Sequence, residues 1–139
     1  MTNNLLSRRR ILITGAARGL GFAFAEQIAS AGASVVMADI LAEQVNASAA
    51  ELREKGLNVF AVTVDVRDPA SVTAAAEKTV ELLGGLDGLV NNAAITNSGG
   101  KTSEKLTIET WDLVQEVNVR GTWLMTNACL PALRESGRG

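Results

Sequence analysis

Short apolar runs alternate with longer segments of helical periodicity along the 139 residues of this chain. The apolar runs predict four β-strands, at residues 11–13, 35–38, 59–64 and 88–90. The periodicity between them predicts helices over about 19–31 and 41–55, and a third helix that begins at Asp68-Pro69. Strands that alternate with helices are typical of βαβ units on a parallel sheet, and strands that are apolar throughout belong to a sheet covered on both faces.

Each predicted helix has an apolar stripe that is expected to face the sheet. In the first helix, the stripe consists of Leu20, Phe24 and Ile28, and Gly32 follows as the left-handed residue past the helix end. The stripes of the next two helices are Val45, Ala49 and Leu52, and then Val72, Ala76, Val80 and Leu83.

The last third of the chain has a different pattern. Residues 93–106 are polar and rich in Gly, Ser and Thr, which predicts a mobile loop. Trp111, Val114 and Val117 then mark a helix, residues 123–133 continue as a second or bent helix, and the chain closes in a turn. We expect one domain over residues 1–139, with a flexible tail at residues 1–9.

Composition narrows the function classes. The net charge is −2, which gives no reason to expect nucleic acid or an anionic membrane as a partner. A single cysteine, Cys129, fits a soluble protein of the reducing cytoplasm. The chain has no histidine and no tyrosine, so Ser-His-Asp hydrolysis and His/Cys zinc sites are excluded and no metal site is predicted.

The strongest local motif is the turn from Thr14 to Gly21, TGAARGLG, between the first strand and the first helix. Glycines at 15, 19 and 21 permit a tight turn, close approach of the backbone to a pyrophosphate, and close helix–strand packing. The helix then presents free N–H groups and the positive end of its dipole to the phosphates. The turn therefore predicts a nucleotide site.

Asp39 supports this prediction because it ends the second strand, 18 residues after Gly21. A carboxylate there accepts hydrogen bonds from the ribose hydroxyls of adenosine and repels a 2′-phosphate, which favours NAD over NADP. Arg18 favours NADP instead, since a basic side chain in the turn can contact a 2′-phosphate. The alternative for Asp39 is a helix N-cap.

These motifs together resemble the short-chain dehydrogenase/reductase family. The spacing Thr-Gly-x-x-x-Gly-x-Gly is joined by Asp65-Val66 after the third strand, by Asn91-Asn92-Ala93-Ala94 after the fourth, and by Asn118 in VNVRGT. The resemblance implies a Rossmann-type, doubly wound α/β sheet, here with four strands in the order 3-2-1-4. The family more often has glycine at position 94.

The resemblance implies a role for each of these positions. Asp65 accepts from the adenine amino group, the Val66 backbone pairs with the ring, Asn91 stabilises the central strand, and Ala93-Ala94 lie along the cofactor. Asn118 is the helix-kinking asparagine whose carbonyl holds a proton-relay water, or alternatively a buried, hydrogen-bonded polar residue. The predicted cofactor-binding residues are Gly15, Ala17, Arg18, Gly19, Leu20, Gly21, Asp39, Ile40, Asp65, Val66, Asn92, Ala93 and Ala94.

The reaction residues of the family, a serine and a Tyr-x-x-x-Lys pair, lie beyond the next strand and so beyond Gly139. We therefore expect the NAD-binding portion of an oxidoreductase that transfers hydride between nicotinamide and an alcohol or carbonyl, truncated and catalytically incompetent by itself. The open edge of the fourth strand and the C-terminal helix are expected to drive homo-oligomer formation.

Two other classes remain as alternatives. The chain could be a non-enzymatic nucleotide-binding or regulatory protein, although it ends where a strand is expected to start. It could also be a methyltransferase-like domain that binds S-adenosylmethionine, which has an acid after its second strand as well. That class has a different glycine turn and no reason to have Asn91-Asn92-Ala93-Ala94 or Asn118.

Overall fold

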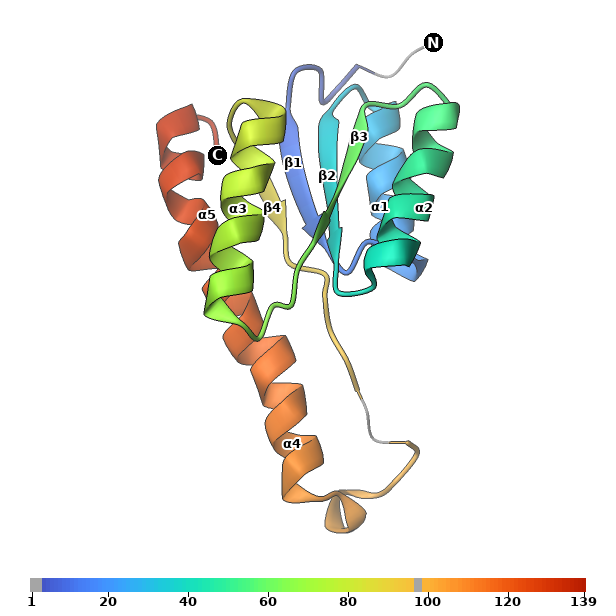
Figure 1. The fold of residues 1–139 in the computed structure, drawn as a ribbon, viewed down its shortest axis with the longest axis vertical. Helices are drawn as coiled ribbons and strands as arrows, with labels where there is room; N and C mark the ends of the chain where they lie inside the picture. Colours follow the sequence, from blue (N-terminus) through green and yellow to red (C-terminus); the bar gives the residue numbers. More distant parts are fainter. Residues whose placement is uncertain (1–3, 97–98) are drawn as a thin grey trace.

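The computed structural model describes residues 4–96 and 99–139, which form a parallel sheet with helices on both faces (Figure 1). The strands are β1 (Arg10–Thr14), β2 (Ser34–Asp39), β3 (Val59–Thr63) and β4 (Gly88–Val90). Their order in the sheet is β3-β2-β1-β4, and all neighbouring pairs are parallel. The predicted Rossmann-type fold and its 3-2-1-4 order are therefore confirmed.

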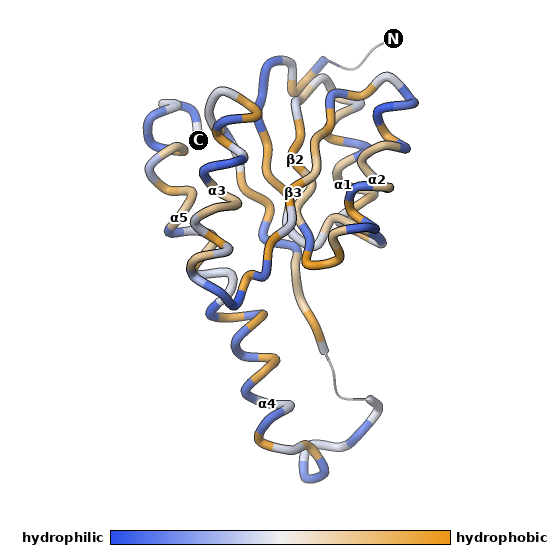
Figure 2. The backbone as a smooth tube through the Cα atoms, viewed as in Figure 1, coloured by the Kyte–Doolittle hydropathy of each residue, from blue (hydrophilic) through white to orange (hydrophobic). Residues whose placement is uncertain are grey.

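Two helical layers bury the sheet. Helices α1 (Gly19–Ser30) and α2 (Ala42–Glu54) cover one face, and α3 (Pro69–Leu83) and α5 (Thr122–Ser136) cover the other (Figure 1). Successive residues of β1 pack into different hydrophobic cores. Ile13 packs on the α1–α2 side of the sheet, and Leu12 packs on the α3–α5 side. Both are fully buried, as expected for a strand covered on both faces. Figure 2 shows the resulting apolar interior and the hydrophilic outer faces of the helices.

The predicted buried stripe of α1 is wrong at Leu20 and Phe24, while its third member, Ile28, packs against the core as expected. Leu20 is 70% exposed and Phe24 is 39% exposed, while the residues buried against the sheet are Gly21, Ala25 and Ala29. These small side chains let the helix lie close to β1 and β2. The prediction failed because it weighted the large apolar residues, whereas the close approach selects the stripe of small ones. Gly32, with φ of +98°, follows the helix as predicted.

The start of α3 matches its prediction. The Asp68 carboxylate accepts a hydrogen bond from the Ala70 N–H at 3.0 Å, and Pro69 occupies the first helical position. Val72 and Ala76 are buried as expected, but Ala75 and Thr79 are buried as well, so the contact face is wider than the predicted stripe.

The C-terminal segment is one continuous, bent helical path. Helix α4 (Ile108–Gln115) leads into a π-helical segment, η2 (Glu116–Gly121), and then into α5. In α5, Met125 and Cys129 are buried against the sheet, while Trp123 is 63% exposed. A 3₁₀ turn (Ser103–Lys105) lies in the predicted loop, whose residues 97 and 98 are outside the described part of the chain.

Both ends of the described chain lie at the end of the sheet where the strands begin (Figure 1). The Leu6 N–H donates to the Ala31 carbonyl at 2.9 Å, and the Leu6 side chain packs against the α1–α2 core. The flexibility of residues 1–9 stays a prediction, but residues 4–9 lie against the domain. At the other terminus, the Arg138 guanidinium donates to the Asp87 carboxylate and to the Arg8 carbonyl.

Arg10, Asp87 and Arg138 form a cluster of charged side chains, the Asp87 cluster. The Asp87 side chain is fully buried, and it accepts from the Arg10 Nε and Nη2 at 2.9 Å, from the Arg10 N–H at 3.0 Å, and from the Arg138 Nε at 3.0 Å. Hydrogen bonds from the Arg10 guanidinium, then from Arg138 and the Arg10 backbone, hold the pKa of Asp87 far below its ordinary value. This pair ties β1 to the segment that enters β4.

We expect the Asp87 cluster to make the stability of the fold acid-sensitive. Because the folded pKa is depressed, the unfolded state binds the proton first, so the stabilisation is complete above about pH 4 and is lost as the pH falls below it. Asp87→Asn should cost about 3–5 kcal/mol at pH 7 and flatten the loss of stability between pH 4 and 2 in urea unfolding. The control Glu81→Gln alters an exposed pair with Lys78. Equal pH slopes for the unmodified chain and Asp87→Asn would contradict this expectation.

Candidate functional site

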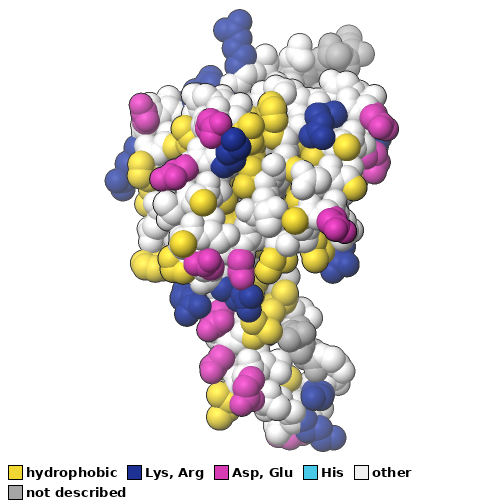
Figure 3. Space-filling model, in the orientation of Figure 1, with side chains coloured by type: hydrophobic (Ala, Val, Ile, Leu, Met, Phe, Trp, Pro, Cys, Tyr) yellow, Lys and Arg dark blue, Asp and Glu magenta, His cyan; other side chains and the backbone are white. Residues whose placement is uncertain are grey.

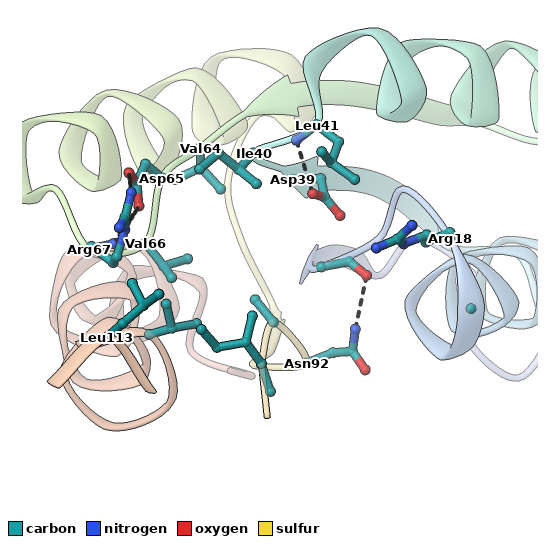
Figure 4. Close-up of a pocket in the computed structure, with 16 residues that line it drawn as sticks. Arg18, Asp39, Ile40, Leu41, Val64, Asp65, Val66, Arg67, Asn92 and Leu113 are labelled. Carbon is teal, nitrogen blue, oxygen red and sulfur yellow. Dashed lines mark hydrogen bonds and ion pairs between the residues drawn. The ribbon is translucent and has the colours of Figure 1, made fainter. Parts of the chain in front are cut away.

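A pocket of about 520 Å³ opens where the carboxyl ends of the strands meet the loops that follow them (Figure 4). Residues after β1, β2, β3 and β4 all contribute to its wall, and Leu113 and Val117 close it from α4 and η2. Open parallel sheets bind ligands in this crevice, because the loops and helix N-termini there present unpaired backbone groups.

The glycine turn forms one end of the pocket through Gly15, Arg18 and Gly19. Gly15 has φ of +65°, and a Cβ there would lie 2.8 Å from the Ala93 Cα. A Cβ on Gly21 would overlap the Gly15 carbonyl oxygen and lie 2.8 Å from the Ala16 Cα. Gly19 differs, since its φ is +60° but nothing lies within 4 Å of an added Cβ. The turn is thus tightly packed behind and open on the pocket side.

The start of α1 faces this open side. Its N-cap, Arg18, makes no capping hydrogen bond through its side chain, and the first turn contains no acidic residue. Free N–H groups at the helix N-terminus therefore remain for an anionic group in the pocket.

Asn92 fastens the glycine turn to β4. Its Nδ2 donates to the carbonyls of Thr14 and Gly15, each at 3.0 Å, and its N–H donates to the Thr14 Oγ1 at 3.1 Å. The strand-stabilising role predicted for Asn91 is therefore wrong. Successive residues at the end of β4 point to opposite faces, so Asn91 lies toward α5, where its Nδ2 donates to the Thr126 Oγ1 at 3.1 Å.

Asp39 ends β2 beside the glycine turn. Its Oδ2 accepts from the Ala17 N–H at 3.0 Å, and its Oδ1 accepts from the Leu41 N–H at 3.1 Å. Each carboxylate oxygen has two acceptor positions, so both keep one for a ligand. The Arg18 side chain lies at this same end of the pocket (Figure 4).

The middle of the pocket is apolar, and its far end is charged. Ile40, Leu41, Val64, Val66, Leu113 and Val117 supply the apolar walls. At the far end, the Arg67 Nε donates to the Asp65 Oδ1 at 3.0 Å and the Arg67 Nη2 donates to Oδ2 at 2.8 Å. These hydrogen bonds lower the pKa of Asp65 and keep it ionised. Figure 4 shows this pair and Asp39 at opposite ends of the pocket.

Asn118 lies in the π-helical segment η2, beside the pocket rather than in its wall. Its Oδ1 accepts from the Ile95 N–H at 2.9 Å, and its Nδ2 donates to the Ile95 carbonyl at 2.8 Å. The side chain therefore pairs with the segment after β4 as a neighbouring strand would. Its own carbonyl accepts from the Thr122 Oγ1 at 2.9 Å.

Most of the predicted cofactor residues share the pocket wall, namely Gly15, Arg18, Gly19, Asp39, Ile40, Asp65, Val66, Asn92, Ala93 and Ala94. Three predicted residues do not line it: Ala17 and Gly21 are buried behind the turn, and Leu20 is exposed. The prediction missed Leu41, Val64, Arg67, Ile95, Leu113 and Val117. The spacing of Leu113 and Val117, one helical turn apart, was the available signal for the last two.

The family assignment follows from a comparison of the sequence with known families. The sequence profile described as "short chain dehydrogenase" matches residues 9–139, nearly the whole chain. The chain belongs to the short-chain dehydrogenase family.

Several short-chain dehydrogenases resemble this chain closely. A 3-alpha-(or 20-beta)-hydroxysteroid dehydrogenase of Mycobacterium bovis is 40% identical over 92% of the chain and 47% of its own length. A 1-deoxy-11-beta-hydroxypentalenate dehydrogenase of Streptomyces exfoliatus is 38% identical over 96% of the chain and 48% of its own length. The chain thus spans about half the length of these curated short-chain dehydrogenases.

A solved structure gives the same result for the fold. The 3-ketoacyl-(acyl-carrier-protein) reductase from Brucella melitensis, crystallised with NADH, superposes with a TM-score of 0.89 at 36% identity. The match covers 95% of this chain and 53% of the reductase. Within the described residues, no helix of this short-chain dehydrogenase is both long and apolar enough to cross a membrane.

Proposed function

We propose that the pocket binds NAD and that the protein is an oxidoreductase acting on an alcohol or carbonyl substrate. The observation that carries the proposal is the shape of the pocket, which has an open glycine turn at one end, an apolar middle and a carboxylate at each end. When bound, the nicotinamide accepts or donates a hydride. The chain contains no tyrosine, so the proposal assigns these residues cofactor binding and not the family's tyrosine-dependent proton transfer.

The pyrophosphate belongs at the glycine turn. The free space in front of Gly19 leaves room for it, and the uncapped N-terminus of α1 supplies N–H donors and the positive end of a helix dipole. Gly15, Arg18 and Gly19 would contact it, while Ala17, Leu20 and Gly21 shape the turn. Ala93 and Ala94, opposite the turn, lie along the cofactor toward the nicotinamide.

The adenosine half fits the remaining length of the pocket. Ile40, Val64 and Val66 would hold the adenine ring, and the Asp65 carboxylate would accept a hydrogen bond from its amino group. No described residue accepts from the Val66 N–H, which leaves it available to the ring. The ribose hydroxyls face Asp39.

Asp39 favours NAD over NADP. Its two oxygens are fixed by the Ala17 and Leu41 N–H groups, so the carboxylate cannot turn away from a 2′-phosphate. Arg18 is exposed and makes no capping hydrogen bond, so it can move to meet either cofactor. A fixed like charge outweighs a mobile counter-charge exposed to solvent.

Calorimetric titration of the chain with NAD tests the proposed function. We expect saturable one-site binding with a Kd on the order of 0.1–1 mM, since short-chain dehydrogenases make further cofactor contacts with residues outside this segment. The absence of saturable binding to a chain that is folded by circular dichroism would refute the proposal.

We further propose that a second copy of the chain covers the outer face of α4, η2 and α5. Ile108, Trp111, Val119 and Trp123 lie along it and are between 58% and 76% exposed, and Figure 3 shows hydrophobic side chains exposed over α4. Strand β4 adds an edge that no described residue pairs on its outer side. Edges and apolar patches of this kind are templates for association.

Sedimentation equilibrium is expected to show a dimer or larger species at micromolar concentration. Trp123→Ser should weaken the association, because it removes a large apolar side chain from the face. The control Phe24→Ser removes an exposed aromatic residue on the opposite side of the sheet. A single 14.5 kDa species across the range would show that the face stays uncovered.

The state of Cys129 bears on the cellular compartment of the protein. Burial raises the pKa of the Cys129 thiol to about 11, so the thiol stays protonated and unreactive. A lone, inert cysteine suits a reducing compartment, and we propose the cytoplasm.

A further inference from the structure

We propose that Arg67 is a positioning residue that selects adenine as the base of the bound dinucleotide. It does so by holding the Asp65 carboxylate in one orientation and leaving it a single free acceptor. The inference rests on the proposed function, since it concerns the base of the cofactor assigned to this pocket.

Among the described residues, Arg67 alone donates hydrogen bonds to the Asp65 carboxylate. Its Oδ1 accepts from the Arg67 N–H and from the Arg67 Nε, both at 3.0 Å, which uses both acceptor positions of that oxygen. Its Oδ2 accepts from the Arg67 Nη2 at 2.8 Å, which leaves one position. The guanidinium is a planar fork, so this two-point contact fixes the plane of the carboxylate as well as its charge.

The backbone N–H and carbonyl groups of Asp65 also form hydrogen bonds. The Asp65 N–H donates to the Ser71 Oγ at 3.0 Å, and the Asp65 carbonyl accepts from the Asp68 N–H at 3.1 Å. Asp65 therefore presents one acceptor at a fixed place, next to the free N–H of Val66. Without the fork, a carboxylate that is 28% exposed turns toward water and loses this orientation.

The free acceptor position of the Asp65 Oδ2 and the Val66 N–H match one edge of adenine. The base carries an amino donor at C6 and an acceptor at N1, which complement the free Oδ2 position and the Val66 N–H. Hypoxanthine has the reverse pattern, a carbonyl at C6 and an N–H at N1, so it would oppose acceptor to acceptor and donor to donor. A fixed carboxylate rejects this base, because neither mismatched group can be relieved by rotation.

Competition calorimetry with NAD and nicotinamide hypoxanthine dinucleotide tests the inference. For the unmodified chain, we expect NAD to bind at least about tenfold more tightly, the effect of losing one charge-assisted hydrogen bond. Arg67→Met, which keeps the length of the side chain without the fork, should reduce this ratio to about threefold or less. Loss of a merely structural contact would weaken both dinucleotides equally and leave the ratio unchanged.

The matched control is Arg53→Met. Arg53 donates to the Val59 carbonyl at 3.1 Å and does not line the pocket, so its loss should leave the ratio at its original value. If Arg67→Met fails to fold, Arg67→Lys serves instead, because lysine keeps the charge but cannot form the two-point contact, and it should also lower the ratio.

The outcomes separate the inference from the proposed function. An unchanged ratio in a folded Arg67 variant, or equal binding of the two dinucleotides by the unmodified chain, overturns the role of Arg67 while NAD binding stands. A lack of binding by either dinucleotide to the unmodified chain overturns both.

Discussion

Gly21→Ala is expected to abolish NAD binding and to destabilise the chain by about 1–3 kcal/mol. The added Cβ would overlap the Gly15 carbonyl oxygen and would lie 2.7 Å from the Asn92 Nδ2 and 2.8 Å from the Ala16 Cα. Two of these neighbours are backbone atoms of the glycine turn, so the turn itself must move. Its displacement would break the two hydrogen bonds through which Asn92 holds it. Calorimetric titration with NAD and urea unfolding measure the two effects.

Gly88→Ala is the matched control for this substitution. Gly88 lies at the far end of β4, and an added Cβ there meets only the Ile11 Cδ1, at the end of a flexible side chain that can shift. We expect NAD binding to persist in this variant. Equal binding by Gly21→Ala and the unmodified chain would show that the turn does not form the phosphate site.

Asp39→Asn should lower the preference for NAD over NADP by about tenfold or more. The substitution removes the charge that opposes a 2′-phosphate and weakens the hydrogen bonds to the ribose hydroxyls, and each tenfold change corresponds to about 1.4 kcal/mol. Asparagine keeps the size of the side chain and one acceptor oxygen, so part of the contact with the Ala17 and Leu41 N–H groups remains. Asp39→Ala should reduce or reverse the preference in the same sense.

Titration of each variant with NAD and NADP at a fixed salt concentration gives the ratio. The control Glu43→Gln removes a negative charge in the first turn of α2, close in sequence but outside the pocket wall. It should leave the ratio nearly unchanged, because an exposed charge is screened by solvent and salt. Tighter binding of NADP by the unmodified chain would show that Arg18, and not Asp39, decides between the cofactors.

The strands were predictable from local signals, whereas their order was implied by the resemblance to short-chain dehydrogenases. The apolar runs and the N-cap at Asp68 depend only on near neighbours in sequence. The buried face of α1 was not predictable in this way. Its choice of Gly21, Ala25 and Ala29 over the larger Leu20 and Phe24 depends on how closely the helix approaches the sheet, which is a property of the assembled layers.

The pocket residues, too, were only partly predictable from the sequence. The glycine turn and Asp39 were predicted from their own chemistry and spacing, and Asp65, Val66, Asn92, Ala93 and Ala94 were implied by the family resemblance. Arg67 was missed, since its role depends on a side chain that turns back to Asp65, two residues earlier. The role predicted for Asn91 belongs to Asn92 for a similar reason. Both follow β4, and only the direction of each side chain shows which one reaches the glycine turn.

The central claim is that NAD occupies the pocket at the carboxyl ends of the strands. Backbone amide NMR spectra of the labelled chain, recorded during titration with NAD, test it most directly because they locate the binding site. We expect saturable shift changes clustered at residues 15–21, 39–41, 64–67 and 92–95. Saturable changes confined to another surface, such as the outer face of α4 and α5, or no saturable changes at all, would contradict the claim.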